Sequence, residues 1–421
     1  MRLIVAAAIG AVLVAPLTRA QSWSLDVSGQ LRERFESSQN PVFGLSEPAQ
    51  NDVFLHRAAL SGDLRQGDGF RALVEVVGGY TSGWAGSPPP TQDDPFDVLQ
   101  AFVETSLPLA NSEVVVRAGR QELTLGSSRL VSVRESPNIR RAFDGIRATW
   151  ARSEDTRVDV FMVRPVFPED GLIDDRSSSE QSFWGAYATF LPAVLGGAAM
   201  DAYYLGLRRE DASFAQGQGR ELRHSVGLRV FGESDGWDWN LEGVWQWGSF
   251  GAARIRAWTL SLDAGYTFSS VPFAPRVGLK SDAISGDRDP LDATLGTFNP
   301  LFPKLPYFSE ANLVTPANLL DIQPSVSLSL TQRLNFSVSW NALWKYAEAD
   351  AFYSPPLSAV DDTSMTSTTD IGRQVSTAIE WNASDDLSLA ATYVTFEPRG
   401  VARQAGGRDG SFFMASIQLT F

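Results

Sequence analysis

The pattern at the C-terminus constrains the fold of this 421-residue chain more than any other feature. Apolar side chains occupy every second position there, at Phe413, Ala415, Ile417, Leu419 and Phe421, and the positions between them are mostly polar. Such a strand has one apolar face and one polar face. A terminal strand of this kind is typical of an outer-membrane β-barrel, in which the last strand pairs with the first and leaves no edge in lipid. Taken alone, the segment is also compatible with an edge strand of a soluble sheet.

The N-terminus favours the membrane alternative. Arg2 is followed by an almost wholly apolar segment, 3–17, and then by small residues before Gln21. This pattern predicts a secretory signal peptide over residues 1–20. We find no linker after it, so residues 21–421 are expected to form a single transmembrane β-barrel domain with long extracellular loops. No later apolar run reaches about 18 residues, and no membrane-spanning helix is therefore expected.

Alternation with a period of two recurs along the whole chain. In the first strand Trp23, Leu25 and Val27 share one face, and polar residues share the other. The segment 237–247 carries tryptophans at both ends, as expected for two interfacial aromatic girdles on a lipid-facing surface, and 336–346 repeats the alternation with large aromatic residues on one face. Short turns alternate with long loops. We therefore predict an all-β fold, a transmembrane antiparallel outer-membrane β-barrel of about 18 strands in a bacterial cell.

Composition limits the chemistry that is open to this chain. It has no cysteine and two histidines, so no metal site and no cofactor are expected. Lysine occurs three times among 35 basic residues, which leaves 35 − 3 = 32 arginines. A guanidinium is planar and can bind a carboxylate through two parallel hydrogen bonds. The net charge is −14, and no nucleic-acid partner is expected.

The polar positions that alternate with the apolar ones along each strand are expected to line the lumen. They carry both arginines and acidic residues. These charges either neutralise one another along the wall, or an excess of arginine at one level forms an electropositive constriction for anions. Seven arginines fall between Arg117 and Arg147, where a polar loop between two strands could fold into the pore. The alternative is a structural clamp in which Glu122, Glu135 and Asp144 neutralise those arginines. An error of one residue in the strand register would exchange the two faces. Arg120 already falls on a position that is expected to face lipid and not the lumen. The candidate pore-lining residues for substrate binding are Arg32, Arg57, Arg71, Arg117, Arg120, Arg129, Arg134, Arg140, Arg141, Arg147, Arg229 and Asp144.

Two segments resemble the bacterial alginate export family. The matching residues of the first are Arg117, Gly119-Arg120-Gln121, Gly126, Arg129-Leu130-Val131, Arg134, Pro137-Asn138, Arg140-Arg141 and Phe143-Asp144-Gly145. The second is Gly296-Thr297-Phe298-Asn299-Pro300-Leu301-Phe302-Pro303. The resemblance implies an 18-stranded outer-membrane barrel with an arginine-rich pore, whose founding activity is secretion of the polyuronate alginate.

The leading functional hypothesis is a channel that passes anionic saccharides such as alginate-like polyuronates, with export favoured over uptake. Its partners would be outer-membrane lipid, the acidic polysaccharide or a small anion, and, for export, a periplasmic secretion scaffold. The first alternative is a general or uptake porin for small organic anions. An enzyme is not expected, because the one adjacent pair, His224-Ser225, lies on opposite faces of its strand. Adhesion through the long loops is the remaining alternative.

Overall fold

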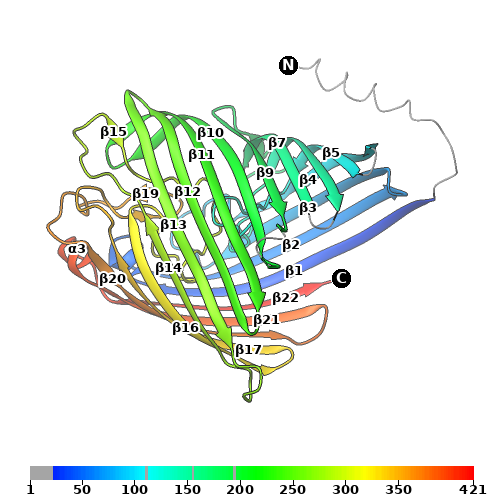
Figure 1. Cartoon of the computed structure of the whole chain (residues 1–421). Helices are drawn as coiled ribbons and strands as arrows, with labels where there is room; N and C mark the ends of the chain where they lie inside the picture. The colour runs from blue at the N-terminus through cyan, green and yellow to red at the C-terminus, as the bar shows by residue number, and fades with distance from the viewer. Residues whose placement is uncertain (1–21, 110–111, 154–155, 193–195) are drawn as a thin grey trace.

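The alternating segments form a closed wall of antiparallel strands (Figure 1). The computed structural model describes residues 22–109, 112–153, 156–192 and 196–421. The expected signal peptide, 1–20, lies outside the described residues. Within them, 18 long strands follow one another around the barrel, each paired with its neighbours in sequence, which confirms the predicted fold class.

The barrel strands are long and slanted, as a lipid-spanning wall requires. In chain order they are β1 (Trp23–Gln39), β2 (Gln50–Gln66), β3 (Phe70–Ser82), β4 (Asp94–Leu109), β5 (Ser112–Gln121), β6 (Phe143–Ser153), β7 (Thr156–Phe167), β9 (Gln181–Phe190), β10 (Ala199–Phe214), β11 (Gly217–Ser234), β12 (Trp237–Phe250), β13 (Ala253–Thr267), β14 (Arg276–Ile284), β16 (Leu319–Thr331), β17 (Leu334–Trp344), β20 (Asp370–Asn382), β21 (Leu387–Pro398) and β22 (Gly410–Thr420).

Short elements occur in the long connections at one end of the barrel. They are α2 (Pro41–Gly44), β8 (Arg176–Ser177), β15 (Thr294–Leu295), β18 (Tyr353–Ser354), β19 (Ser358–Ala359) and α3 (Gly400–Gln404). None of the helices in the described part of the chain is long and apolar enough to cross a membrane.

The first and last strands close the barrel, as the C-terminal pattern predicted. β1 pairs with β22 in a register that sets Gln30 opposite Thr420. Beyond the last strand, the Gly29 N–H donates to the Phe421 carbonyl at 2.8 Å, and the Phe421 N–H donates back at 3.0 Å. The Phe421 ring packs against Gly29, in the space where the Cβ of any other residue would collide with it. The seam is therefore joined by backbone pairing and covered by the terminal aromatic ring.

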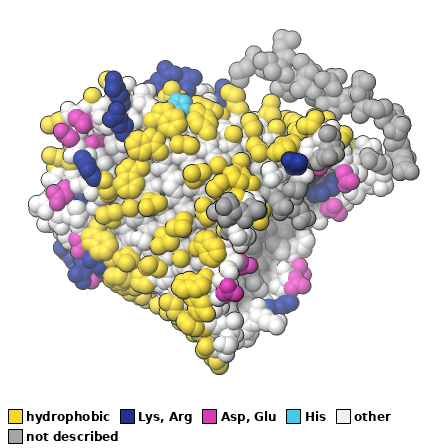
Figure 2. Space-filling model, in the orientation of Figure 1, with side chains coloured by type: hydrophobic (Ala, Val, Ile, Leu, Met, Phe, Trp, Pro, Cys, Tyr) yellow, Lys and Arg dark blue, Asp and Glu magenta, His cyan; other side chains and the backbone are white. Residues whose placement is uncertain are grey.

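The outer surface of the wall is apolar. Leu25 is 64% exposed and Leu260 is 59% exposed, whereas Arg32, on the opposite parity, is 4% exposed. Hydrophobic side chains spread over the barrel face seen in Figure 2, and most of the charged groups visible there lie toward its margins. The predicted lipid parity of these strands is therefore confirmed.

The inside of the barrel is filled in part by two long connections, 122–142 and 285–318. Their apolar side chains form the main buried cluster with inward-facing residues of the wall, such as Phe183, Leu205 and Val244. Leu130, Val131 and Phe302 join this cluster from the two loops. The core of this barrel is thus made jointly by the wall and the loops.

Candidate functional site: a basic pocket inside the barrel

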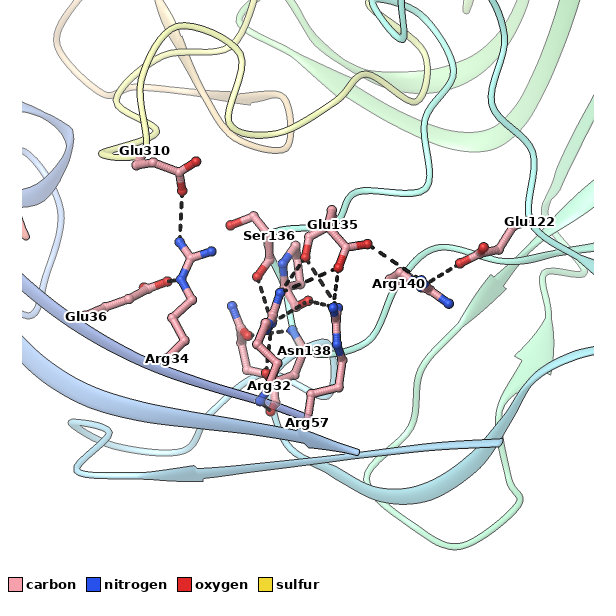
Figure 3. A network of polar contacts seen from close by, with 12 residues as sticks. Arg32, Arg34, Glu36, Arg57, Glu122, Glu135, Ser136, Asn138, Arg140 and Glu310 are labelled. Atoms are coloured by element: carbon pink, nitrogen blue, oxygen red, sulfur yellow. Dashed lines mark hydrogen bonds and ion pairs between the residues drawn. The ribbon is translucent and has the colours of Figure 1, made fainter. Parts of the chain in front are cut away.

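The loop 122–142 is held inside the barrel by arginines of the wall. Arg32 on β1 donates to the backbone carbonyl oxygens of Glu135 at 2.8 Å and Pro137 at 3.1 Å, and to Asn138 Oδ1 at 3.1 Å. Arg57 on β2 forms an ion pair with the Glu135 carboxylate. Figure 3 shows both guanidinium groups pointing from the two strands into the loop. Arg32 and Arg57 are almost fully buried, so their positive charges are used to fix the loop.

The two inward loops also bind each other. The Ser132 N–H donates to the Phe302 carbonyl at 2.9 Å, and the Phe302 N–H donates to the Leu130 carbonyl at 2.8 Å. On the other side, the Asn299 N–H donates to Gln246 Oε1 of β12 at 3.0 Å. The segments 117–147 and 296–303, which were matched separately in the sequence, therefore meet in space.

Most of the predicted arginines are paired with carboxylates. Along the lumen wall, Arg117 donates to Glu104 at 2.7 Å, and Arg71 and Arg147 pair with neighbouring aspartates at 2.9 Å each. Deeper in the barrel, Arg129 pairs with Glu242 at 3.3 Å and Arg229 with Asp201 at 2.8 Å. Mutual neutralisation is therefore the environment of these five side chains.

Arg140 occupies the acidic side of the loop. Its guanidinium lies 2.7 Å from Glu75 Oε1 and 2.7 Å from Glu122 Oε1. Burial raises the pKa of Glu122 to about 7; Arg140 opposes this rise, and the nearby Glu75 adds to it. The three charged groups form a compact network beside the loop's anchor (Figure 3 shows two of them).

Arg134 and Arg141 differ from the others, since neither forms an ion pair with a carboxylate of the described residues. Burial lowers the pKa of Arg141 well below its usual value, and the neighbouring charge of Arg134 adds to this effect. A guanidinium still stays protonated at neutral pH, so the two positive charges lack compensation. The Arg141 guanidinium donates to the Ser132 carbonyl at 3.4 Å and lies over the Phe302 ring, 5.1 Å from its centroid.

Both of these arginines line a cavity of 310 Å³ between the inward loops and the wall. Arg140 and Arg209 of β10 add two further guanidinium groups to its lining, and Phe302, Leu301 and Val166 give it an apolar side. We call this cavity the basic pocket. Chemically, it combines planar carboxylate-binding groups with an apolar surface against which a sugar ring can pack.

Arg209 was not among the predicted residues. It lies on the parity of the buried Leu205 and Leu207, so the alternation of β10 held the signal that would have found it. It is paired with Glu221 at 2.6 Å, and is therefore less available than Arg141.

Arg120 and Asp144 lie apart from the basic pocket. They pair with each other at 3.0 Å, and Arg120 also donates to the Asp175 carbonyl at 3.1 Å in the connection 168–180. The structure therefore places them at the end of the strands where the long connections lie, which we call the outer end, and not together with Arg134 and Arg141. The lipid parity of Arg120 noted in the sequence agrees with this separate position.

The only adjacent histidine–serine pair does not form a nucleophile and base. The Tyr204 hydroxyl and His224 Nδ1 lie 2.7 Å apart, and His224 stacks on Trp247. Ser225 is fully buried and accepts a hydrogen bond from Gln246 at 3.1 Å. The two side chains thus have separate surroundings on opposite faces of β11, as the alternation predicted.

Comparisons with known proteins agree with this architecture. The family model described as "Alginate export" matches residues 23–416. A comparison with curated proteins finds no match.

Among solved structures, the barrel is similar to Pseudomonas aeruginosa OccK3 (OpdO), with a TM-score of 0.61 and 12% identity over 94% of this chain and 96% of that one. Acinetobacter baumannii OccAB2 gives 0.62 and 9% over 94% and 98%. Pseudomonas aeruginosa OccK2 (OpdF), solved in complex with glucuronate, gives 0.58 and 13% over 94% and 97%. At these identities the likeness shows the fold.

Proposed function

The chain belongs to the alginate export family of the bacterial outer membrane, and we propose that it is a channel for anionic saccharides whose carboxylates bind in the basic pocket. The observation that carries this proposal is the pair Arg134 and Arg141, which line the cavity without a carboxylate partner among the described residues. A bound anion would supply the missing negative charge. The other predicted arginines hold the wall and the loop in position.

The basic pocket suits a uronate better than a small inorganic anion. A uronate carries one carboxylate for a guanidinium fork and one sugar ring for the apolar side near Phe302. The carboxylates around the pocket, such as Glu122 next to Arg140, keep the local field from becoming too positive. Binding is then weak enough for release, as passage through a channel requires.

Export of an alginate-like polyuronate is the direction that membership of the family favours. A cavity of 310 Å³ lies at the small end of the roughly 300–1,000 Å³ of small-molecule sites, so it holds a sugar unit at a time. A polymer would pass by exchange of successive carboxylates at this position. Export would also require a periplasmic secretion scaffold to deliver the chain.

Uptake of small organic anions is the second candidate. It is favoured by the size of the pocket and by the similar barrel of OccK2, which was solved with glucuronate, a single uronate. In that case the two inward loops would act as a filter for monomers, and no scaffold would be needed.

Solute entry into proteoliposomes tests the proposal. We expect glucuronate to enter faster than glucose, which has no carboxylate, and Arg141→Gln to slow glucuronate entry by about tenfold, the loss of roughly 1.5 kcal/mol of charge-assisted hydrogen bonding. The matched control is Arg333→Gln in a periplasmic turn, where the partner Asp385 is 90% exposed. Equal entry of both sugars, or equal slowing by both variants, would contradict the proposal.

Oligouronates of increasing length separate export from monomer uptake in the same vesicles. The export hypothesis predicts that chains of several units enter and compete with glucuronate. If only the monomer and dimer enter, the uptake hypothesis is correct and the exporter hypothesis is wrong.

A further inference from the structure

Three carboxylates gather outside the basic pocket, where the outer end of β4 meets the connection 168–180. They belong to Asp94, Asp97 and Asp175, and one oxygen of each lies within 4.8 Å of the corresponding oxygens of the other two. Backbone pairing brings the segments together, since the Ile173 N–H donates to the Phe96 carbonyl at 3.1 Å. The cluster thus joins two segments that are about eighty residues apart in the sequence.

Asp94 is the residue that the fold itself does not explain. Its side chain is fully buried, and neither of its carboxylate oxygens has a hydrogen-bond partner, although the Phe96 N–H is nearby. Leaving a buried charged group without a partner costs more free energy than losing an ordinary hydrogen bond. A group of this kind, aimed at two other carboxylates, indicates a missing positive partner.

The surroundings do not supply enough positive charge. Asp97 Oδ2 accepts the backbone N–H groups of Asp174 at 2.7 Å and Asp175 at 3.0 Å, which are neutral donors. Arg120 Nη1 lies 3.8 Å from Asp97 Oδ1, but the same guanidinium is paired with Asp144 at 3.0 Å. With Asp174 counted, four carboxylates share part of one arginine among the residues that the structure describes.

We propose that Asp94, Asp97 and Asp175 bind a divalent cation, Ca²⁺, which fastens the connection 168–180 to the outer end of β4. Calcium takes oxygen ligands at about 2.3–2.6 Å, so two oxygens on one ion lie at most roughly 5 Å apart, as the three carboxylates do. A set of carboxylates without imidazole or thiolate also suits a hard cation such as Ca²⁺ better than Zn²⁺ or Cu²⁺. The composition, with two histidines and no cysteine, predicts no metal site; an all-oxygen site needs neither residue.

Calcium binding to the purified full-length protein in detergent tests the site directly. Titration calorimetry with CaCl₂ should find one ion per chain with a Kd of roughly 10⁻⁴–10⁻³ M, as in other extracellular calcium modules. Asp94→Asn keeps the shape and removes the unpartnered charge, and it should weaken binding at least tenfold. The control is Asp361→Asn, which removes an exposed acidic group from another loop and should leave binding unchanged.

Limited trypsin digestion gives a second measurement, because the Arg176 side chain in this connection is 74% exposed. Calcium should slow cleavage after Arg176 in the natural protein and not in Asp94→Asn. Asp175→Asn provides the same comparison if Asp94→Asn does not yield a folded barrel. Absence of binding at about 10 mM Ca²⁺, ten times the weakest expected Kd, or equal binding by the natural protein and the variants, would overturn the proposal.

Discussion

Individual arginines of one barrel have different functions, which are set by their partners. Arg117 faces Glu104 at 2.7 Å, whereas Arg141 has no carboxylate partner among the described residues and lines a cavity. The first arrangement neutralises charge and braces the wall. The second leaves charge available to a ligand.

Arg117→Gln should therefore lower stability more than it changes selectivity. The substitution leaves Glu104 half-buried without its cation, at a cost of about 1–3 kcal/mol. Urea unfolding, followed by the gel mobility of the folded barrel, should show a lower midpoint for Arg117→Gln and an unchanged midpoint for Arg333→Gln. A large change in anion selectivity with unchanged stability would contradict this assignment.

Glu122 is expected to make both the stability and the anion selectivity of the channel depend on pH near neutrality. Burial raises its pKa from 4.5 to about 7, with Arg140 opposing the shift. Between these values the folded protein holds a proton that the unfolded chain releases, so this group's contribution to stability falls as pH rises through about 7. Ionisation also adds a negative charge beside Arg140, so anion selectivity should fall between pH 6 and pH 8. In Glu122→Gln this part of the pH dependence should disappear; if it persists, another group is responsible.

Residue positions and residue pairings differ in how far the sequence predicts them. Alternation placed Arg32 and Arg57 on the polar parity, and the structure buries both in that position. It could not predict their partners, because those are carbonyl oxygens for Arg32 and the Glu135 carboxylate for Arg57, in a loop 78 to 105 residues away. For the same reason the unpaired state of Arg141 could not be derived from its neighbours in the chain.

The loop 122–142 forms one side of the basic pocket, and its anchor to β1 can be tested. Arg32→Met removes the donor for three loop carbonyls and Asn138 Oδ1 while keeping the side-chain bulk. We expect larger or more frequent current fluctuations in single-channel recordings, since the loop loses its attachment to β1. Arg65→Met, whose arginine pairs with Asp63 instead, should leave the recordings unchanged. An Arg32→Met channel with the same current fluctuations as the natural protein would show that the loop is held by other contacts.

Gly126 of the loop signature is required by its backbone conformation and by the close packing around it. Gly126 has a φ of +52°, and a Cβ there would collide with the Tyr187 hydroxyl, which donates to Asp201 at 2.6 Å. The sequence predicts a loop at this position that could fold into the pore. The close approach of Gly126 to β9 depends on tertiary packing and could not be derived from the spacing of residues in the sequence.

For the whole molecule, barrel closure follows from the two ends of the chain. We expect Phe421→Ala to reduce the yield of folded barrel, because the ring covers Gly29 where β1 meets the C-terminus. Refolding from urea, measured by gel mobility, should be slower than for Phe273→Ala, which removes an exposed ring from a turn. Equal refolding of the two variants would limit the role of Phe421 to its backbone.

The architecture was more predictable than the site. Period-two alternation, with tryptophans at strand ends, determines which face meets lipid and how many strands cross it, and 18 strands were both predicted and found. The basic pocket depends on where 130–132 and 296–303 meet, which is a contact between distant loops. The sequence therefore predicts which segment contains the site, but not which residues meet there or how they are arranged.

If Arg134 and Arg141 make this barrel select anions, the reversal potential of a planar bilayer under a KCl gradient should reveal it. We expect chloride selectivity for the natural protein, reduced by added glucuronate, and a loss of most of that selectivity in Arg134→Gln/Arg141→Gln. A cation-selective natural channel, or a double variant with unchanged selectivity, would contradict it.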